Sequence, residues 1–479
     1  MAVPKKLWKR SCGGISRWFL YESVPSTFDV SKQPGSPNAP VQKLPVELLG
    51  EIFSWTLGEW GPMTDEPSAL LLEPLTISHV CGHWRAVSLS MPMLWATIWI
   101  DRPRVSHISM VKLWVERSRT CPLSIYLRQT DPKSCLSFPT STEHDLTDEI
   151  FAVLLPHLSR WQTVDLIFKT DTQRSLVSIS GDEAVALEHA ALQVDSWDSA
   201  GADSIQSALY SRPLVRSVCL YPSSSQHHVR WEQLTHVDAE LECTPETWLS
   251  LLASSPALCS AKFACSAQPD WAATSFTHPE KYLTLPLIVE LSIKASRIDL
   301  APLFDRLTLP ALRALALEYC HVPRTMPDQQ SLHSLLDRSS CVLEFFSLHE
   351  TARMRDAQRH ITYLQIPLLA SLKDLELKVD MTNEIVEFLT LDSQGSPPLP
   401  NLTAIVLNDS SRGDHISDVA LLHMLSSRRS STSNAALLCS AELKLRLTSH
   451  KTFALSVNEC GRDNLNLRCE LLNCFCECT

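Results

Sequence analysis

The chain has 479 residues, 44% of them hydrophobic, and a formal net charge of −11 at pH 7. That length suits one large elongated domain with a small module, or about three ordinary domains. The acidic balance argues against a protein that binds nucleic acid or anionic membranes, since either needs a dominant basic surface. No run approaches the roughly 18 apolar residues of a membrane span. With nucleic acid and membranes both disfavoured, we expect protein partners.

Residues 1–40 combine a basic cluster with a segment poor in apolar residues. Such a segment buries too little apolar surface to offset its ordering entropy, so we predict a disordered basic arm. Its apolar stretch, Trp18 to Tyr21, is too short for the core of a signal peptide. The 16 cysteines then favour reduced core thiols and a cytoplasmic or nuclear location.

Residues 41–101 carry two amphipathic patterns, and Pro45 suits the first position of the first helix. The apolar residues that share the predicted face of this helix are Leu48, Leu49, Ile52 and Phe53. The apolar residues of a second predicted helix are Ile77, Val80, Cys81, Trp84 and Val87. Two or three short helices cannot bury all these side chains among themselves, so we expect a partner surface to complete the core.

Three motifs follow one another in this region: LPxEΦLxxIF, VCxxWR and SxPxLWxxI, where Φ is apolar. Together they resemble the F-box of fungal F-box proteins, over the whole module. In that family the helices bind a Skp-family adaptor, which joins the F-box protein to a cullin-RING ubiquitin ligase. The chain departs from the family in a long connection between the helices, and in Gly82 and His83, which replace the usual basic residues. The adaptor-binding residues that the resemblance implies are Leu44, Pro45, Leu48, Leu49, Ile52, Phe53, Val80, Cys81 and Trp84.

A second pattern, Φ-x-x-Φ-x-Φ with Φ apolar or small, recurs along the chain in steps of 19 to 31 residues. It begins at Trp161, Leu187, Val215, Leu234, Leu258, Ile288, Leu312, Leu343, Leu372 and Leu402. The occurrence from Leu312 to Val322 reads LxxLxLxxCxV, close to the leucine-rich-repeat signature. One unit cannot bury its own leucines, but stacked units share a continuous core under a parallel sheet. We therefore predict an α/β fold, in which a short all-helical F-box module precedes a leucine-rich-repeat-like solenoid with a curved parallel sheet.

The predicted organisation has five parts. They are the arm (1–40), the F-box domain (41–101), a connecting helix and strand region (102–160), the repeat domain (161–447) and a poorly ordered Cys-rich tail (448–479). The tail contains Cys460, Cys469, Cys474, Cys476 and Cys478. Their alternating C-x-C spacing lacks the residues between ligands that are typical of zinc knuckles. An unstructured terminus or an atypical reading-frame end is favoured over zinc, and no metal site is predicted.

One face of the predicted sheet is a candidate binding surface. Because successive side chains of a strand face opposite sides, the residues between the apolar positions line the exposed face. By resemblance to F-box proteins that carry leucine-rich repeats, this face would bind the protein substrate. The predicted substrate-binding residues are Glu290, Lys294, Glu318, Phe345, His349, Glu376 and Lys378. Phe345 and His349 are the first to test, because an exposed aromatic residue needs a reason.

Motifs for covalent chemistry are missing from the sequence. It contains no nucleophile elbow, phosphate-binding loop, dinucleotide fingerprint or HExxH motif, and only 12 glycines. We therefore predict no catalytic residues and no cofactor, and expect the substrate-recognition subunit of an SCF-type cullin-RING E3 ligase. Two alternatives stay open: a non-ligase scaffold in which the F-box is a structural cap of the solenoid, and a hydrolase that uses an unassigned cysteine or histidine.

Overall fold

The computed structural model describes the chain in thirteen segments. They are residues 44–56, 73–129, 141–168, 184–194, 199–222, 228–266, 282–321, 328–350, 357–391, 397–409, 416–429, 435–446 and 466–472. The predicted arm and most of the predicted tail lie outside these ranges. The chain divides into two compact units, Met1–Arg230 and Trp231–Thr479. None of the described helices has the length and apolar character that crossing a bilayer requires.

The first unit begins with short helices. In chain order they are α1 (Val46–Thr56), α2 (Glu73–Val80), α3 (Gly82–Ser90) and the 3-10 turn η2 (Pro92–Trp95). The sequence predicts one helix in this region, but the structure has two, α2 and α3. They are separate because Cys81 adopts an extended conformation with φ −160° and ψ 171°. The Cys81 sulfur then accepts a hydrogen bond from the backbone N–H of Trp84, at 3.4 Å. Cys81 is thus the N-cap of α3, and Gly82 is its first residue rather than a break within a helix.

A parallel sheet follows in the first unit, with strand order β1-β2-β3-β4-β5. Its strands are β1 (Thr97–Asp101), β2 (Leu123–Arg128), β3 (Trp161–Phe168), β4 (His189–Val194) and β5 (Ser217–Leu220). The helices between them are α4 (Val105–Arg117), α5 (Ser141–Leu154), η3 (Leu155–Arg160) and α7 (Ser199–Tyr210). One row of apolar side chains in register crosses all five strands and is buried: Ile98, Ile125, Val164, Ala190 and Val218.

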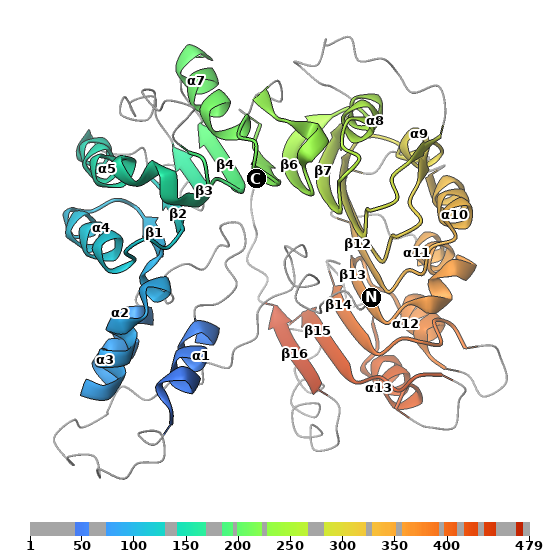
Figure 1. Cartoon of the computed structure of the whole chain (residues 1–479). Helices are drawn as coiled ribbons and strands as arrows, with labels where there is room; N and C mark the ends of the chain where they lie inside the picture. Colours follow the sequence, from blue (N-terminus) through green and yellow to red (C-terminus); the bar gives the residue numbers. More distant parts are fainter. Residues whose placement is uncertain are drawn as a thin grey trace. The chain divides into compact units, whose positions relative to one another are not determined.

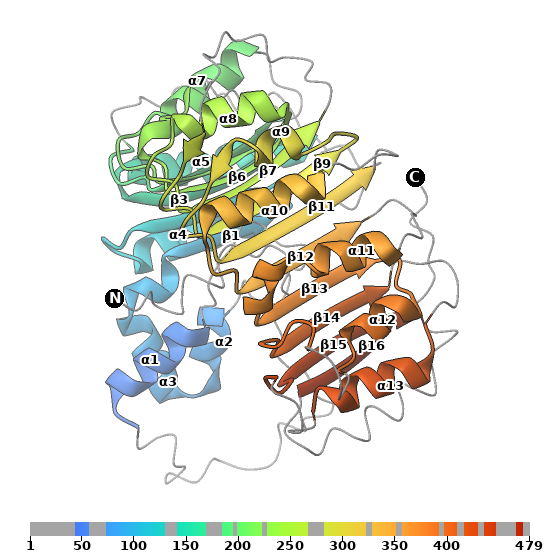
Figure 2. The ribbon, with the colours of Figure 1, turned by 90° about the vertical axis from the view of Figure 1, so that its right-hand side faces the viewer.

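The second unit repeats the same arrangement at greater length, with strand order β6-β7-β9-β11-β12-β13-β14-β15-β16. These strands are β6 (His236–Cys243), β7 (Ser260–Ser266), β9 (Glu290–Ser296), β11 (Ala314–His321), β12 (Phe345–Glu350), β13 (Asp374–Val379), β14 (Ala404–Asp409), β15 (Ser440–Arg446) and β16 (Asn466–Leu472). The helices are α8 (Pro245–Ala253), α9 (Ala301–Phe304), α10 (Asp328–Ser339), α11 (Ala357–Leu364), α12 (Asn383–Leu389) and α13 (Asp418–Ser427). Two further strands, β8 (Leu283–Thr284) and β10 (Leu307–Thr308), pair with each other. The helices α8 to α13 cover one face of this sheet (Figures 1 and 2).

The predicted repeat positions agree with the observed strands. From Leu187 to Leu402, each of nine predicted occurrences is followed two residues later by the first residue of a strand, as at Leu312 and Ala314; the tenth, Trp161, begins β3 itself. Within β11, Leu315 and Leu317 are 0% and 1% exposed, as is Leu312 just before it at 0%. The apolar positions therefore form the core between strands and helices, and the prediction of a solenoid-like α/β fold is confirmed.

The sheets extend beyond the predicted limits of the repeat domain at both ends. β1 lies inside the predicted F-box domain, and β1, β2 and β3 pair in order, so the strand β2 of the predicted connecting region continues the same parallel sheet. At the other end β16 pairs with β15 over seven residues, within the predicted poorly ordered tail. Leu465, Leu467, Cys469 and Leu471 alternate with polar or charged residues, a pattern that predicts a strand. The prediction for the tail used only the spacing of its cysteines.

Candidate functional site

The candidate site is the side of β9, β11, β12 and β13 that faces away from the helices, which we call the helix-free face (Figure 2). The four strands pair in parallel and in register, so their outward side chains form three rows across them. The first row is Glu290, Ala314, Phe345 and Asp374; the second is Ser292, Ala316, Ser347 and Glu376; the third is Lys294, Glu318, His349 and Lys378. All seven predicted substrate-binding residues lie in these rows, so the structure brings them onto one face.

The third row contains a compact charged group around Glu318. The Lys294 ammonium lies 3.7 Å from one carboxylate oxygen, and His349 Nδ1 lies 3.8 Å from the other. The interaction with His349, supported by the charge of Lys294, lowers the pKa of Glu318 to about 2 despite partial burial. Glu318 is therefore ionised at neutral pH, and its carboxylate already has two polar neighbours on the adjacent strands.

The other side of His349 has a different environment. His349 is aligned with Lys378 on β13, and no described carboxylate oxygen lies within the 4.0 Å ion-pair distance of the Lys378 ammonium. The His349 Nε2 atom is buried and has no hydrogen-bond partner within the described segments. An unsatisfied ring nitrogen beside an uncompensated lysine is the kind of exception that needs an explanation in a folded protein.

Carboxyl groups of the first and second rows are partly withdrawn from water. Burial raises the pKa of Glu290 to about 7, against the effect of a hydrogen bond that the Ser260 hydroxyl donates to it at 3.2 Å. Burial also raises the pKa of Asp374 and of Glu376. Because the charged form of each carboxyl is disfavoured, the first row presents less negative charge near neutral pH than its composition implies.

Phe345 corrects one part of the sequence prediction. It lies on the helix-free face but is only 6% exposed, so it is not the exposed aromatic residue that the strand alternation predicts. Its partner in register on β11 is Ala314, which is also buried, at 5% exposure. Neighbouring strands lie about 4.8 Å apart, so an aromatic ring can cover a short alanine beside it. Phe345 is therefore largely covered, and His349, whose side chain is 20% exposed, is the more accessible of the two.

The predicted adaptor-binding residues fall into two sets. Leu48, Ile52 and Val80 are 51%, 45% and 57% exposed, and Pro45 is also exposed. In contrast, Leu49 and Phe53 are 0% and 1% exposed. The four apolar residues of α1 share one face of the helix, as the sequence predicts, but only the edge with Leu49 and Phe53 is buried.

The buried set holds the helical module together. The rings of Phe53 and Trp84 lie 4.9 Å apart, which joins α1 to α3. Leu44, Cys81 and Trp84 are partly exposed, and Cys81 also caps α3. In the conformation described, Leu48, Ile52 and Val80 are the apolar residues of the predicted set that remain most accessible to a partner.

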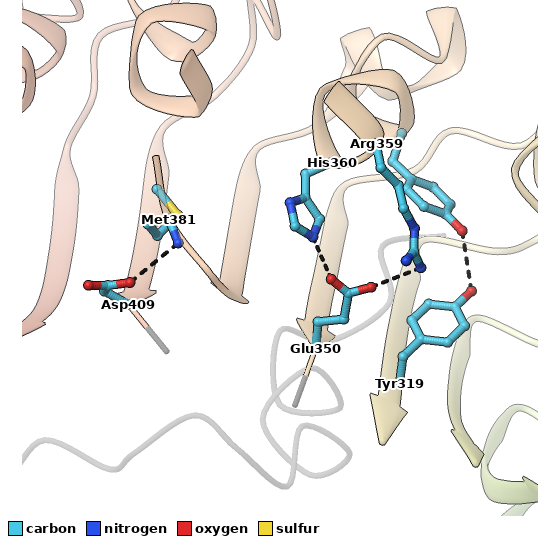
Figure 3. A network of polar contacts seen from close by, with 7 residues as sticks. Tyr319, Glu350, Arg359, His360, Met381 and Asp409 are labelled. Atoms are coloured by element: carbon cyan, nitrogen blue, oxygen red, sulfur yellow. Dashed lines mark hydrogen bonds and ion pairs between the residues drawn. The ribbon is translucent and has the colours of Figure 1, made fainter. Parts of the chain in front are cut away.

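A polar network that the sequence did not predict lies at the end of β12, shown in Figure 3. Glu350, only 2% exposed, has one carboxylate oxygen 2.6 Å from His360 Nε2 and the other 2.8 Å from Arg359 Nη2. The hydroxyls of Tyr319 and Tyr363 lie 3.4 Å apart beside it. Both oxygens of Glu350 are occupied by residues of α11, so the network fixes α11 to β12 rather than offering a reactive group.

The same figure includes a second contact of this kind, in which the backbone N–H of Met381 donates to the Asp409 carboxylate at 3.3 Å. Within the described segments, no group of three or more His, Cys, Asp or Glu side chains could hold a metal ion. Of the tail cysteines, Cys469 lies in β16 and the others lie outside the described residues.

Comparisons with known proteins add little. No family model matches the chain, and no curated protein sequence matches it. Among solved structures, one similar chain is a Bacteroides fragilis protein from a structural genomics consortium, with 10% sequence identity and a TM-score of 0.33. The match covers 70% of this chain and 85% of that chain. A likeness at this level carries no argument about fold or function.

Proposed function

We propose that this chain is the substrate-recognition subunit of an SCF-type cullin-RING E3 ubiquitin ligase. In this proposal the module of α1 to α3 binds a Skp-family adaptor, and the helix-free face binds a protein target in the cytoplasm, the nucleus or both. The chain itself performs no covalent chemistry. The proposal starts from the resemblance of LPxEΦLxxIF, VCxxWR and SxPxLWxxI to the fungal F-box.

The observation that carries the proposal is the group of exposed apolar side chains Leu48, Ile52 and Val80. Three aliphatic residues that are each about half exposed on one small module need a reason, since their exposure contributes nothing to folding. Covering them with a second protein would contribute on the order of 3 kcal/mol. A Skp-family adaptor is the partner that the resemblance implies.

A co-purification experiment with paired substitutions tests the adaptor role. Leu48→Arg with Ile52→Arg places charges on the exposed side of α1 without touching its buried residues, so we expect the fold to remain and adaptor retention to fall at least about tenfold. Leu422→Arg is the matched control, because Leu422 is 44% exposed on another helix, α13. If the unmodified chain retains no Skp-family adaptor while a control F-box protein does, the ligase role is wrong.

A second candidate is a non-ligase scaffold in which the helical module is a structural cap. The burial of Leu49 and Phe53 favours it, because these residues serve the module's own packing. The scaffold predicts that the double arginine variant keeps every partner that the unmodified chain has. The same experiment therefore separates the two candidates.

A further inference from the structure

We propose that the third row of the helix-free face binds an acidic segment of the target protein, with anionic side chains placed over Lys294, Lys378 and Lys444. This inference rests on the proposed role of the helix-free face in target binding. It names the chemistry of the target: carboxylate or phosphate groups on an extended segment that crosses the strands.

The first argument is that charge is segregated along the strands. The register extends the third row from Lys378 to Asn408 on β14 and to Lys444 on β15. Over the six strands β9 to β15, this row contains Lys294, Glu318, His349, Lys378, Asn408 and Lys444. The first row contains Glu290, Ala314, Phe345, Asp374, Ala404 and Ser440. Lysines thus occur in the third row and not in the first, and the two rows are four residues, about 13 Å, apart.

The second argument concerns which charges remain uncompensated. The charge of Glu318, the acidic residue of the third row, is balanced by the Lys294 ammonium at 3.7 Å. Lys444 contacts Glu442, its second neighbour along β15, at 2.9 Å. Lys378 lies between these groups without a described carboxylate in contact. The Lys294–Glu318 pair is exposed and therefore weak, whereas the side chains of Lys444 and Glu442 are only 21% and 17% exposed. Lys378 is thus the lysine of the third row that can take an anionic partner without giving up a described ion pair.

Partial burial of the carboxyl groups in the first row increases the difference in charge between the first and third rows. Burial raises the pKa of Glu290 to about 7 and raises the pKa of Asp374, so the first row attracts a cationic segment only weakly at neutral pH. The second row adds the carboxyl groups of Glu376 and Glu442, but burial raises the pKa of Glu376 and Glu442 already contacts Lys444. The third row is therefore the stronger electrostatic feature of the face, and it favours an acidic target.

The spacing of the strands predicts how far apart the anionic residues of the target peptide should lie. Lys378 and Lys444 are two strands apart, about 10 Å, and Lys294 and Lys378 are three strands apart, about 14 Å. An extended peptide rises about 3.3 Å per residue. Anionic residues roughly three positions apart fit Lys378 and Lys444, and a third residue about four positions further fits Lys294.

Selection from a library of random 12-residue displayed peptides, with the full-length chain as bait, tests the inference. We expect the retained peptides to be enriched in Asp and Glu at separations of three and four. Lys378→Glu should weaken a selected peptide about tenfold, because it removes one attraction and adds one repulsion. Lys373→Glu is the control, since Lys373 is 55% exposed but lies just before β13, outside the three rows.

Synthetic versions of the best peptide separate the sources of negative charge. The acidic peptide and a version with phosphoserine in place of glutamate are both expected to bind, and the tighter one identifies the natural source. A version with glutamine should bind at least about tenfold more weakly, and affinity should fall as salt rises. The inference is overturned if no acidic enrichment occurs, if the glutamine peptide binds equally, or if Lys378→Glu has no more effect than Lys373→Glu.

The outcome is independent of the adaptor. Adaptor retention by Lys378→Glu should equal that of the unmodified chain, because Lys378 belongs to the second unit and the helical module to the first. Loss of the ligase role would appear as a missing adaptor with peptide selection unchanged. Failure of the present inference would appear as normal adaptor retention with no selection of acidic peptides.

Discussion

Helix α1 and strand β12 each expose one residue more than the next residue along the chain, but the side chains differ in chemistry. In α1, Ile52 is 45% exposed and its neighbour Phe53 is 1% exposed. In β12, the side chain of His349 is 20% exposed and that of Glu350 is 2% exposed. The helix thus leaves an aliphatic side chain about half exposed and buries an aromatic one, whereas the strand leaves a polar side chain partly exposed and buries a charged one.

In both elements the buried residue stabilises the fold, whereas the more exposed residue is not needed for it. Phe53 and Glu350 both have close partners within the chain, at Trp84 and at His360. Ile52 has no comparable contribution to make to folding, and His349 lies beside Lys378, for which no ion pair with a described carboxylate is found. An apolar exposed surface suits one constant partner that always covers it, while a charged exposed surface stays hydrated and suits partners that come and go.

The largest expected effect comes from removing the buried charge in β12. Glu350→Gln keeps the shape of the side chain but removes the carboxylate that contacts Arg359 and His360, and breaking a buried ion pair costs roughly 3 kcal/mol or more. We expect the free energy of unfolding of the second unit to fall by that amount in a urea titration. His349→Gln, on the adjacent residue, should change it by less than about 1 kcal/mol. Equal losses would show that the two sides of β12 do not differ as we describe.

A somewhat smaller and more local effect is expected in α1. Phe53→Ala should lower the stability of the helical module by about 3 kcal/mol, because it leaves a cavity beside Trp84. Ile52→Ala should lower it by less than about 0.5 kcal/mol. Hydrogen exchange of the amides in residues 46–56 measures both. Similar protection in the two variants would contradict the division of α1 into a buried and an exposed side.

Much of the fold was predictable because the repeat imposes a local rule. Positions such as Leu312, Leu315 and Leu317 must be apolar for stacked units to share a core, so the spacing alone located ten strands. The strands at the two ends were not predicted as part of the repeat. At β1 the apolar residues also belong to the F-box-like motif, and at β16 the alternation of apolar residues lies within a Cys-rich segment.

The site was predictable in placement but not in exposure. Strand alternation put Glu318, Phe345 and His349 on one face, but it does not tell how far each side chain is covered there, and Phe345 is only 6% exposed. The buried pair of Glu350 and His360 was also missed. Glu350 ends a strand, and its partner belongs to a later helix, so no fixed spacing connects them; an acidic residue at the buried position of a strand was the one available signal.

The smallest effect concerns pH and the helix-free face alone. Burial raises the pKa of Glu290 from 4.5 to about 7, so the protonated form is favoured in the folded state. The stability that this contributes is complete below pH 4.5 and is lost as pH rises through 7. Glu290→Gln stays neutral and can still accept the hydrogen bond from Ser260. Its free energy of unfolding should therefore exceed that of the unmodified chain at pH 8 by roughly 1 kcal/mol, with allowance for partial solvation, and match it at pH 4.

Glu318→Gln is the matched control for this pH dependence, with the opposite sign. The pKa of Glu318 is lowered to about 2, so its contribution is present above pH 4.5 and is lost as pH falls toward 2. The glutamine variant should therefore be less stable than the unmodified chain at pH 7 and equal to it at pH 2, wherever the chain remains folded. Thermal unfolding of both variants across this range measures the contrast. If both profiles shift in the same direction, the first and third rows do not differ electrostatically, and the reason for placing an acidic target over the third row is lost.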